Sequence, residues 1–484
     1  MSVGGIVGVC IGAAVVALLA FMFLRTAFTR PAKKNIESIE KEPINEKVAA
    51  EHLSEAIKIP TVSVPGDEGD FSAFDRYREF LAKTYPCVHE NSEITVINKH
   101  SLIFKIKGEN EKLLPACFLS HQDVVPVAAE EWSVEPFGGV IKDGYVYGRG
   151  ALDMKGHMIA LLEGLEAILA RKKVPERTIY LCFGHDEEIT GINGACKIVD
   201  YLYEQGIRME YVVDEGGVII DGRSVGVRQK VAVIGTSEKG YADFMLSANK
   251  DGGHASSPKR RSSVDAVCEA VYYLSHMPMK AYWSKPAKET IKTLSPYMPF
   301  AFKFMFVNRD ILSPILKFAM CKVSPLTNSL MRTTFAFTEL KGSDAANVIP
   351  NKASAVVNVR INLGQSVAEV KKYMQKVAGK DVKVEEIGRT FEPVTSGDSK
   401  NVWYKEIERA IDEVFGYVTA PYPFIAASDA KYYNKISKNV FRFGSLEMEE
   451  DDQIRIHSKD ERCKIDSLTH GAQFFARFIE NTCY

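Results

Sequence analysis

Four ionisable residues lie where the sequence predicts the end of a strand or the start of a helix, and a fifth lies in the C-terminal segment. They are two histidines and three carboxylates, namely His121, Asp153, Glu188, Asp214 and His457. Open α/β sheets bind ligands at the edge where the carboxyl ends of their strands gather. We therefore expect the first four residues to meet at one edge of a sheet, with His457 joining them from the C-terminal segment.

The residue types in this cluster predict a metal site. Several carboxylates at one edge would repel one another in the absence of a cation. Imidazole and carboxylate together form a good ligand set for zinc, and two ions bridged by one carboxylate would account for every member. Each residue alone has a plainer explanation, because Asp153 could cap a helix and His457 could be a histidine of a surface loop.

The segments around these residues resemble those of the M20 metallopeptidases. The resemblance covers about residue 46 to the C-terminus, and its segments are His121–Pro126 (HQDVVP), Tyr147–Gly156 (YGRGALDMKG), Asp186–Gly191 (DEEITG), Asp214–Gly217 (DEGG) and Gly253–Pro258 (GHASSP). Asn347 and Arg360 are similar to substrate-contacting residues of the family. A long insert and the segment Ile456–Arg462 are most similar to carboxypeptidase S and N-fatty-acyl-amino-acid synthase/hydrolase.

The resemblance implies how two zinc ions would be held. Asp153 would bridge them, with His121 and Asp214 completing one site and Glu188 and His457 the other. Each ligand would reach its ion from a different segment of the chain.

It also implies roles for five residues beside the ions. Glu187 would be the general base and Asp123 would orient the imidazole of His121. His254 would stabilise the oxyanion, from the partner subunit in dimeric relatives. Arg360 and Asn347 would bind a substrate carboxylate. Each role has a plainer alternative. Glu187 could be a spare carboxylate, Asp123 and His254 could be turn residues, and Arg360 could form a structural salt bridge.

The order of predicted elements indicates an α/β fold in which a smaller domain is inserted. Strand-like runs alternate with helical stretches in residues 46–235, which predicts a mixed, largely parallel sheet with helices on both faces. Residues 236–390 predict a smaller α+β lid or dimerisation domain, and residues 391–484 return to the catalytic domain. A homodimer is one open possibility.

Residues 282–337 form an insert that is rich in Phe and Met. The simplest interpretation is additional core under an enlarged lid. Two functional alternatives stay open, namely an apolar wall beside the substrate site and a surface that dips into lipid.

The N-terminus predicts a single transmembrane helix that anchors the protein in a membrane. Gly5–Leu24 is a run of uncharged residues long enough to cross a bilayer, followed by a tether over residues 25–45. A cleaved signal peptide usually has a shorter apolar run, so we expect an uncleaved anchor. Arg25, Arg30, Lys33 and Lys34 follow the run, which favours a cytoplasmic body. The resemblance favours a lumenal or extracellular body, and we adopt that expectation.

Composition excludes several other classes of protein. The 484 residues carry a net charge of −1, which provides no long-range field for nucleic acid, and we expect no such partner. The nine cysteines contain no CxxC pair and leave at least one thiol free, which argues against a disulfide scaffold.

The resemblance and the cluster together predict a metal-dependent amidohydrolase. Its substrate would have a free carboxylate, and N-acyl amino acids with long acyl chains are the first expectation, with the reverse condensation also open. The alternative is a carboxypeptidase that acts on short peptides. A catalytically dead binding protein is disfavoured because the predicted ligands and the base Glu187 are all present.

Overall fold

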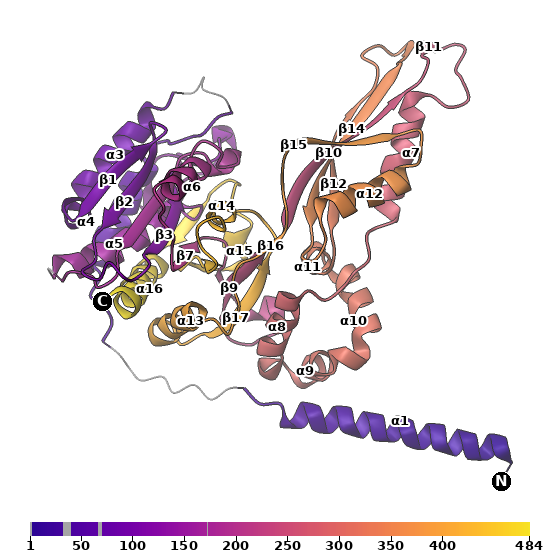
Figure 1. Cartoon of the computed structure of the whole chain (residues 1–484), viewed down its shortest axis with the longest axis horizontal. Coiled ribbons are helices and arrows are strands. Elements are labelled where there is room, and N and C mark those ends of the chain that lie inside the picture. Colours follow the sequence, from indigo (N-terminus) through magenta and orange to yellow (C-terminus); the bar gives the residue numbers. More distant parts are fainter. Residues whose placement is uncertain (1, 32–39, 66–69, 172) are drawn as a thin grey trace.

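The computed structural model shows a body built on two β-sheets, with a long helix beside it (Figure 1). It describes residues 2–31, 40–65, 70–171 and 173–484. Lys33, Lys34 and residues 32–39 of the predicted tether lie outside the described residues.

The first sheet is mixed, and its central strands are parallel. Its strand order is β1 (Ser92–Ile97), β2 (Ser101–Ile106), β6 (Ile179–Gly184), β3 (Ala116–His121), β7 (Tyr211–Asp214), β18 (Val440–Arg442), β9 (Val231–Glu238), β8 (Ile219–Ile220) and β19 (Glu447–Met448), while β16 (Val394–Thr395) and β17 (Val418–Phe424) also pair with β9. The strands β6, β3, β7 and β18 run parallel. Antiparallel β2 and β9 flank them, so the predicted mixed α/β sheet is confirmed.

Helices cover both faces of this sheet because successive side chains of a strand point to opposite faces. In β3, Phe118 packs in one core cluster, whereas Cys117 and Leu119 pack in another. The first face is covered by α2 (Glu46–Ile57), α5 (Lys155–Ala170), α13 (Val402–Val414) and α16 (Ile465–Cys483), and the second by α6 (Ala195–Glu204) and α14 (Ala430–Tyr433). The N-terminal part of the body adds α3 (Ser72–Thr84) and α4 (Pro86–Glu90).

The second sheet is antiparallel and has four strands. Its order is β12 (Thr334–Lys341), β14 (Lys352–Ile361), β10 (Gly240–Asn249) and β15 (Lys383–Phe391). Alternate residues of β10 are buried against α7 (Ser263–His276) and α12 (Val367–Ala378). The chain passes from the first sheet to the second between Glu238 and Gly240, and returns between Phe391 and Val394.

The insert folds into four helices, α8 (Lys285–Leu294), α9 (Phe300–Val307), α10 (Arg309–Val323) and α11 (Pro325–Met331). α8 packs on β17, where Leu294 and Met298 share a core cluster with Val418. Part of the insert is therefore core, as expected. The core lies against the first sheet, and several large apolar residues of α9 and α10 remain exposed.

The N-terminal helix α1 (Val3–Phe28) is long and apolar enough to cross a membrane. It runs beside α9 at the end of the molecule away from the tip at β11 (Gly253–His254) (Figure 1).

Candidate metal centre

Two imidazoles face the two oxygens of a single carboxylate at the edge of the first sheet. His121 ends β3, and its Nε2 lies 3.1 Å from Oδ1 of Asp153. His457 Nε2 lies 3.0 Å from the other oxygen, Oδ2. Asp153 therefore lies between the two histidines, in the arrangement that a bridging ligand requires.

Two further carboxylates complete the cluster, and one of them differs from the sequence prediction. Glu188 Oε2 lies 3.2 Å from His457 Nε2, and Glu215 Oε1 lies 3.5 Å from His121 Nε2. The predicted ligand Asp214 points elsewhere, because its Oδ2 accepts a hydrogen bond from the backbone N–H of Ala430 at 2.8 Å. The structure thus places Glu215, rather than Asp214, against His121.

Strand alternation explains this difference. Asp214 is the last residue of β7 and shares a face with Val212, which packs in the same core cluster as Ala430 of α14. Glu215, one position later, is directed away from α14. Alternation along Tyr211 to Asp214 predicts that Asp214 and Glu215 point to opposite faces, but it does not tell which of the two turns toward His121.

Asp123 contacts the backbone of Glu187 and Glu188 as well as the imidazole of His121. It is fully buried, and its carboxylate accepts hydrogen bonds from the backbone N–H groups of Glu187 and Glu188, each at 3.1 Å. The same carboxylate accepts a 2.6 Å hydrogen bond from Ser63 Oγ and lies 3.3 Å from Nδ1 of His121, while the backbone oxygen of Asp123 lies closer to that nitrogen, at 2.9 Å. One residue therefore fixes the imidazole and the turn that carries both glutamates, and the sequence did not single out Ser63.

Glu461 positions Asp153 in a similar way, and we predicted no role for it from the sequence. Its Oε1 accepts from the backbone N–H groups of Leu152 at 2.8 Å and Asp153 at 3.1 Å. Its Oε2 accepts from Gly150 N at 3.1 Å and forms a buried ion pair with Arg149 at 2.7 Å. Every one of these bonds holds the loop before α5 in place.

Burial, hydrogen bonds and neighbouring charges shift the pKa values of several groups in the cluster. Burial raises the pKa of Glu215 to about 8, and the charge of Asp153 adds to this effect. Hydrogen bonds to Asp153 and Glu188 raise the pKa of His457 to about 10. Burial also raises the pKa of Glu187 well above its usual range. Glu215 and Glu187 therefore resist ionisation without a cation, whereas the hydrogen bonds of Asp153 to His121 and His457 outweigh its burial and lower its pKa.

The donor atoms fit a pair of divalent cations. His121, Asp153 and Glu188 place one donor each within 4.8 Å of one another, and so do His121, Glu187 and Glu215. Oε1 of Glu188 is buried without a hydrogen-bond partner. Two imidazoles with several carboxylates are suitable ligands for zinc or a similar ion.

The three other predicted residues lie on or beside strands of the predicted lid region, residues 236–390, and not among the side chains of the cluster. His254 is exposed in β11 opposite Val348 of β13 (Val348–Ile349), and the backbone oxygen of Asn347 accepts from Ala255 N at 3.0 Å. Arg360 lies near the other end of β14, opposite Tyr241. Since each strand residue spans roughly 3.3 Å, the length of β14 separates Arg360 from the tip that carries His254 and Asn347.

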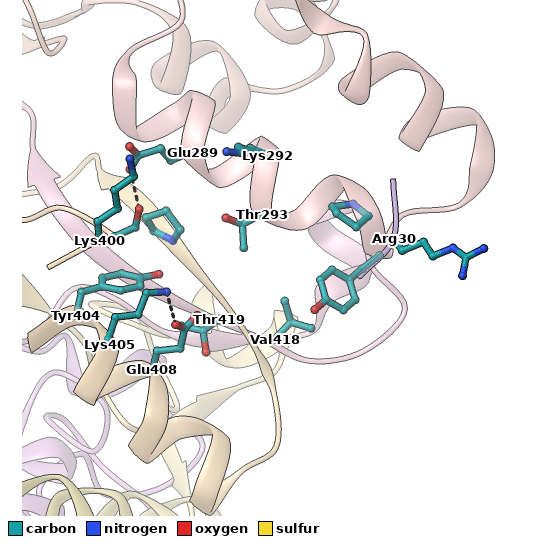
Figure 2. Close-up of a pocket in the computed structure, with 14 residues that line it drawn as sticks. Arg30, Glu289, Lys292, Thr293, Lys400, Tyr404, Lys405, Glu408, Val418 and Thr419 are labelled. Atoms are coloured by element: carbon teal, nitrogen blue, oxygen red, sulfur yellow. Dashed lines mark hydrogen bonds and ion pairs between the residues drawn. The ribbon is translucent and has the colours of Figure 1, made fainter. Parts of the chain in front are cut away.

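A cavity of about 420 Å³ lies apart from the centre, between α8, α13 and β17 (Figure 2). It is lined by cations and anions, among them Arg30, Lys292, Lys400, Lys405, Glu289 and Glu408. None of the predicted site residues lines it, so it is distinct from the cluster around Asp153.

Known proteins share both the sequence pattern and the fold. The profile of peptidase family M20/M25/M40 matches residues 117–481. The chain is 35% identical over 479 residues to N-fatty-acyl-amino acid synthase/hydrolase PM20D1 of Xenopus tropicalis, covering 96% of this chain and 93% of that protein. It is 32% identical over 446 residues to probable carboxypeptidase S-like 2 of Dictyostelium discoideum, covering 90% and 85% of the two chains.

A solved structure agrees at the level of the fold. The M20 family metallo-carboxypeptidase Sso-CP2 from Sulfolobus solfataricus superposes with a TM-score of 0.68 at 18% identity, covering 89% of this chain and 98% of that one. With the predicted motifs and the cluster of residues that could hold a metal ion, these similarities show that the chain belongs to peptidase family M20/M25/M40 and is a metal-dependent hydrolase.

Proposed function

We propose that the chain hydrolyses the amide bond of N-acyl amino acids, in particular those with fatty-acyl chains, and can also catalyse the reverse condensation. The observation that carries the hydrolytic step is the carboxylate of Glu187 beside the His121–Asp153 cluster. Identity over nearly the full length to an N-fatty-acyl-amino acid synthase/hydrolase supports this substrate class.

We assign two zinc ions to the cluster, with Asp153 between them. His121 and Glu215 would hold one ion, and Glu188 and His457 the other. This assignment replaces Asp214 by Glu215, because only the latter faces His121. Bound in this way, the ions would supply Lewis acidity and lower the pKa of water at the site.

Glu187 is the proton carrier in this proposal. It takes a proton from the attacking water and delivers it to the nitrogen of the leaving amino acid as the C–N bond breaks. The products are a carboxylic acid and a free amino acid. Asp123 holds the backbone of Glu187 in place and orients His121, so it acts as a positioning residue.

Arg360 is suited to bind the carboxylate of the amino-acid part. Its guanidinium lies 4.9 Å from the ring centre of Tyr241, and its Nη1 is buried without a hydrogen-bond partner. Burial and the charge of Arg360 lower the pKa of nearby Lys239 to about 7. A buried guanidinium nitrogen without a partner favours an anionic group.

The test of the substrate class compares two amides on the full-length protein in detergent. We expect hydrolysis of N-oleoyl-phenylalanine that a chelator abolishes, and little cleavage of Gly-Phe. The alternative function, a carboxypeptidase for short peptides, is supported by the similarity to the carboxypeptidase S-like protein. Cleavage of Gly-Phe alone would establish that alternative and refute the fatty-acyl proposal.

We also propose that the protein acts as a homodimer in which His254 and Asn347 complete the partner's site. Both are exposed on the tip of one chain, far from that chain's own cluster. The second sheet would then serve as the lid and dimerisation domain of residues 236–390.

Mixing two inactive variants tests this arrangement. Glu187→Gln and His254→Ala should each be inactive as homodimers. When the two are co-expressed, half of the dimers are mixed and each mixed dimer has one intact site, so about a quarter of normal activity should return. A mixture that stays inactive, although mixed dimers are isolated, would place His254 in its own chain's site.

Finally, we propose that α1 is an uncleaved single-pass anchor with the body on the lumenal or extracellular side. A signal sequence shares its length and composition, but Met22 and Thr26 of α1 are buried against the body. This packing supports retention of the helix in the folded protein.

A further inference from the structure

The end of α1 is attached to the insert helices by a buried polar contact. Asn308, which precedes α10, is fully buried, and its Nδ2 donates to Met22 O at 3.3 Å and to Thr26 Oγ1 at 3.1 Å. Thr26 is fully buried as well, and its hydroxyl donates to Met22 O. These contacts fix where the insert lies along α1.

Contacts between aromatic rings fix the position of α9 along the apolar helix α1. The ring centre of Phe23 lies 5.6 Å from that of Phe300 and 5.2 Å from that of Phe304. Phe23 is the second-to-last residue of the uncharged run, and Arg25 is the first charged residue after that run. At about 1.5 Å per residue, the aromatic rings of α9 therefore lie at the depth where the hydrocarbon layer ends.

An ion pair marks the other side of that boundary. Nη1 of Arg25 lies 2.7 Å and 2.9 Å from the two carboxylate oxygens of Asp310, in the first turn of α10. Where α1 meets α9 and α10, aromatic contacts at Phe23 are thus followed within two residues by an ion pair at Arg25. Such a change from apolar to charged contacts is typical of a protein surface at the headgroup layer of a membrane. Arg30, which lines the cavity of Figure 2, keeps the chain near the body beyond α1.

Several large apolar residues are exposed on α9 and α10. They are Phe300, Phe302, Ile311, Ile315, Phe318 and Val323, and we name this set the α9–α10 surface. Ile311, Ile315 and Phe318 follow one another at helical spacing, so they share one face of α10. Phe318 is 70% exposed and Ile315 is 68% exposed. In a soluble helix this face would carry polar residues, and contiguous apolar patches of this kind mark a binding surface.

The charges among these residues favour lipid as the partner. Residues 300–323 contain Lys303, Arg309, Lys317 and Lys322, but Asp310 is their single acid. Arg25 already pairs with Asp310. Basic residues beside Phe, Ile and Leu are typical of helices that lie in a membrane interface, where long cationic side chains reach the headgroups.

We propose that the α9–α10 surface lies in the interfacial layer of the bilayer that α1 spans, so that a span and an in-plane surface together hold the catalytic body against one leaflet. The proposal rests on the membrane anchoring by α1 proposed above. It places the enzyme at the layer into which amphipathic fatty-acyl amides partition.

Fluorescence quenching in lipid tests this placement. The full-length protein is reconstituted in phosphatidylcholine nanodiscs with plain or brominated acyl chains, and a tryptophan is introduced by Phe302→Trp or by Phe318→Trp. Phe21→Trp, in the span, is the positive control, and Tyr272→Trp, exposed on α7 of the second sheet, is the matched negative control. The emission of the parent protein is subtracted from each variant.

We expect brominated chains to quench the added emission of Phe302→Trp and Phe318→Trp to an extent comparable with Phe21→Trp, and not to quench Tyr272→Trp. If Phe21→Trp is quenched and both surface variants are not, the α9–α10 surface contacts something other than lipid and the inference is overturned. If Phe21→Trp is not quenched either, the proposed anchor itself fails. Because these substitutions exchange exposed aromatic residues, all four variants are expected to fold.

Discussion

Glu187→Gln is expected to lower turnover by about 10²–10⁴-fold while both metal ions stay bound, because it removes a proton carrier and not a ligand. The amide keeps the size of the side chain, and the two backbone N–H groups that Asp123 holds are unchanged. KM for N-oleoyl-phenylalanine should change little, since Glu187 is not placed in substrate binding. Steady-state kinetics and metal analysis of the same preparation check both statements.

Glu188→Gln is the matched control, because the same chemical change is made one residue away. Glu188 faces His457 and has a buried oxygen without a partner, so this variant should lose metal as well as activity. The assignment of the base would be refuted if Glu187→Gln turned over substrate at nearly the normal rate, or if its loss of activity followed loss of metal.

Asp153→Ala is expected to release both ions and abolish activity, because its two oxygens face the two histidines. Without this carboxylate, the remaining ligands are split between His121 on one side and His457 on the other. Plasma emission spectrometry should find fewer than one ion per chain, against two in the parent protein.

The control for this variant is Asp143→Ala, which removes a carboxylate exposed in the turn between β4 (Val140–Lys142) and β5 (Tyr145–Tyr147). It should keep two ions and full activity. Circular dichroism would establish that Asp153→Ala is folded. Two bound ions in folded Asp153→Ala would show that this residue does not bridge them.

The sequence predicted the parts of the site that follow from strand ends. His121 ends β3, and the glutamates follow β6, so the parallel order of β3 and β6 brings them to one edge. His457 could not be placed by that rule, because it joins from a turn far along the chain with a φ of 60°. Its residue type suggested it as a further member of the cluster, and only the resemblance assigned it to the same metal position as Glu188.

Other features required three-dimensional contacts that no spacing reveals. Glu461 is 308 positions from Asp153 in sequence, yet it accepts a hydrogen bond from that residue's backbone. Asp214 and Glu215 are adjacent acids, and only the packing of α14 on β7 shows which of them turns toward His121. Composition predicted that the insert is apolar. It could not predict that the part around α8 is buried while apolar residues of α9 and α10 stay exposed, because this depends on how the helices pack.

Anomalous diffraction at the zinc edge from crystals of the full-length protein would locate the two ions. We expect two peaks about 3.5–4 Å apart on either side of Asp153. One peak would lie beside His121 and Glu215, and the other beside Glu188 and His457. A single peak, or two peaks that do not lie on either side of Asp153, would contradict the two-metal site. A peak beside Asp214 instead of Glu215 would overturn the assignment of Glu215 as a ligand.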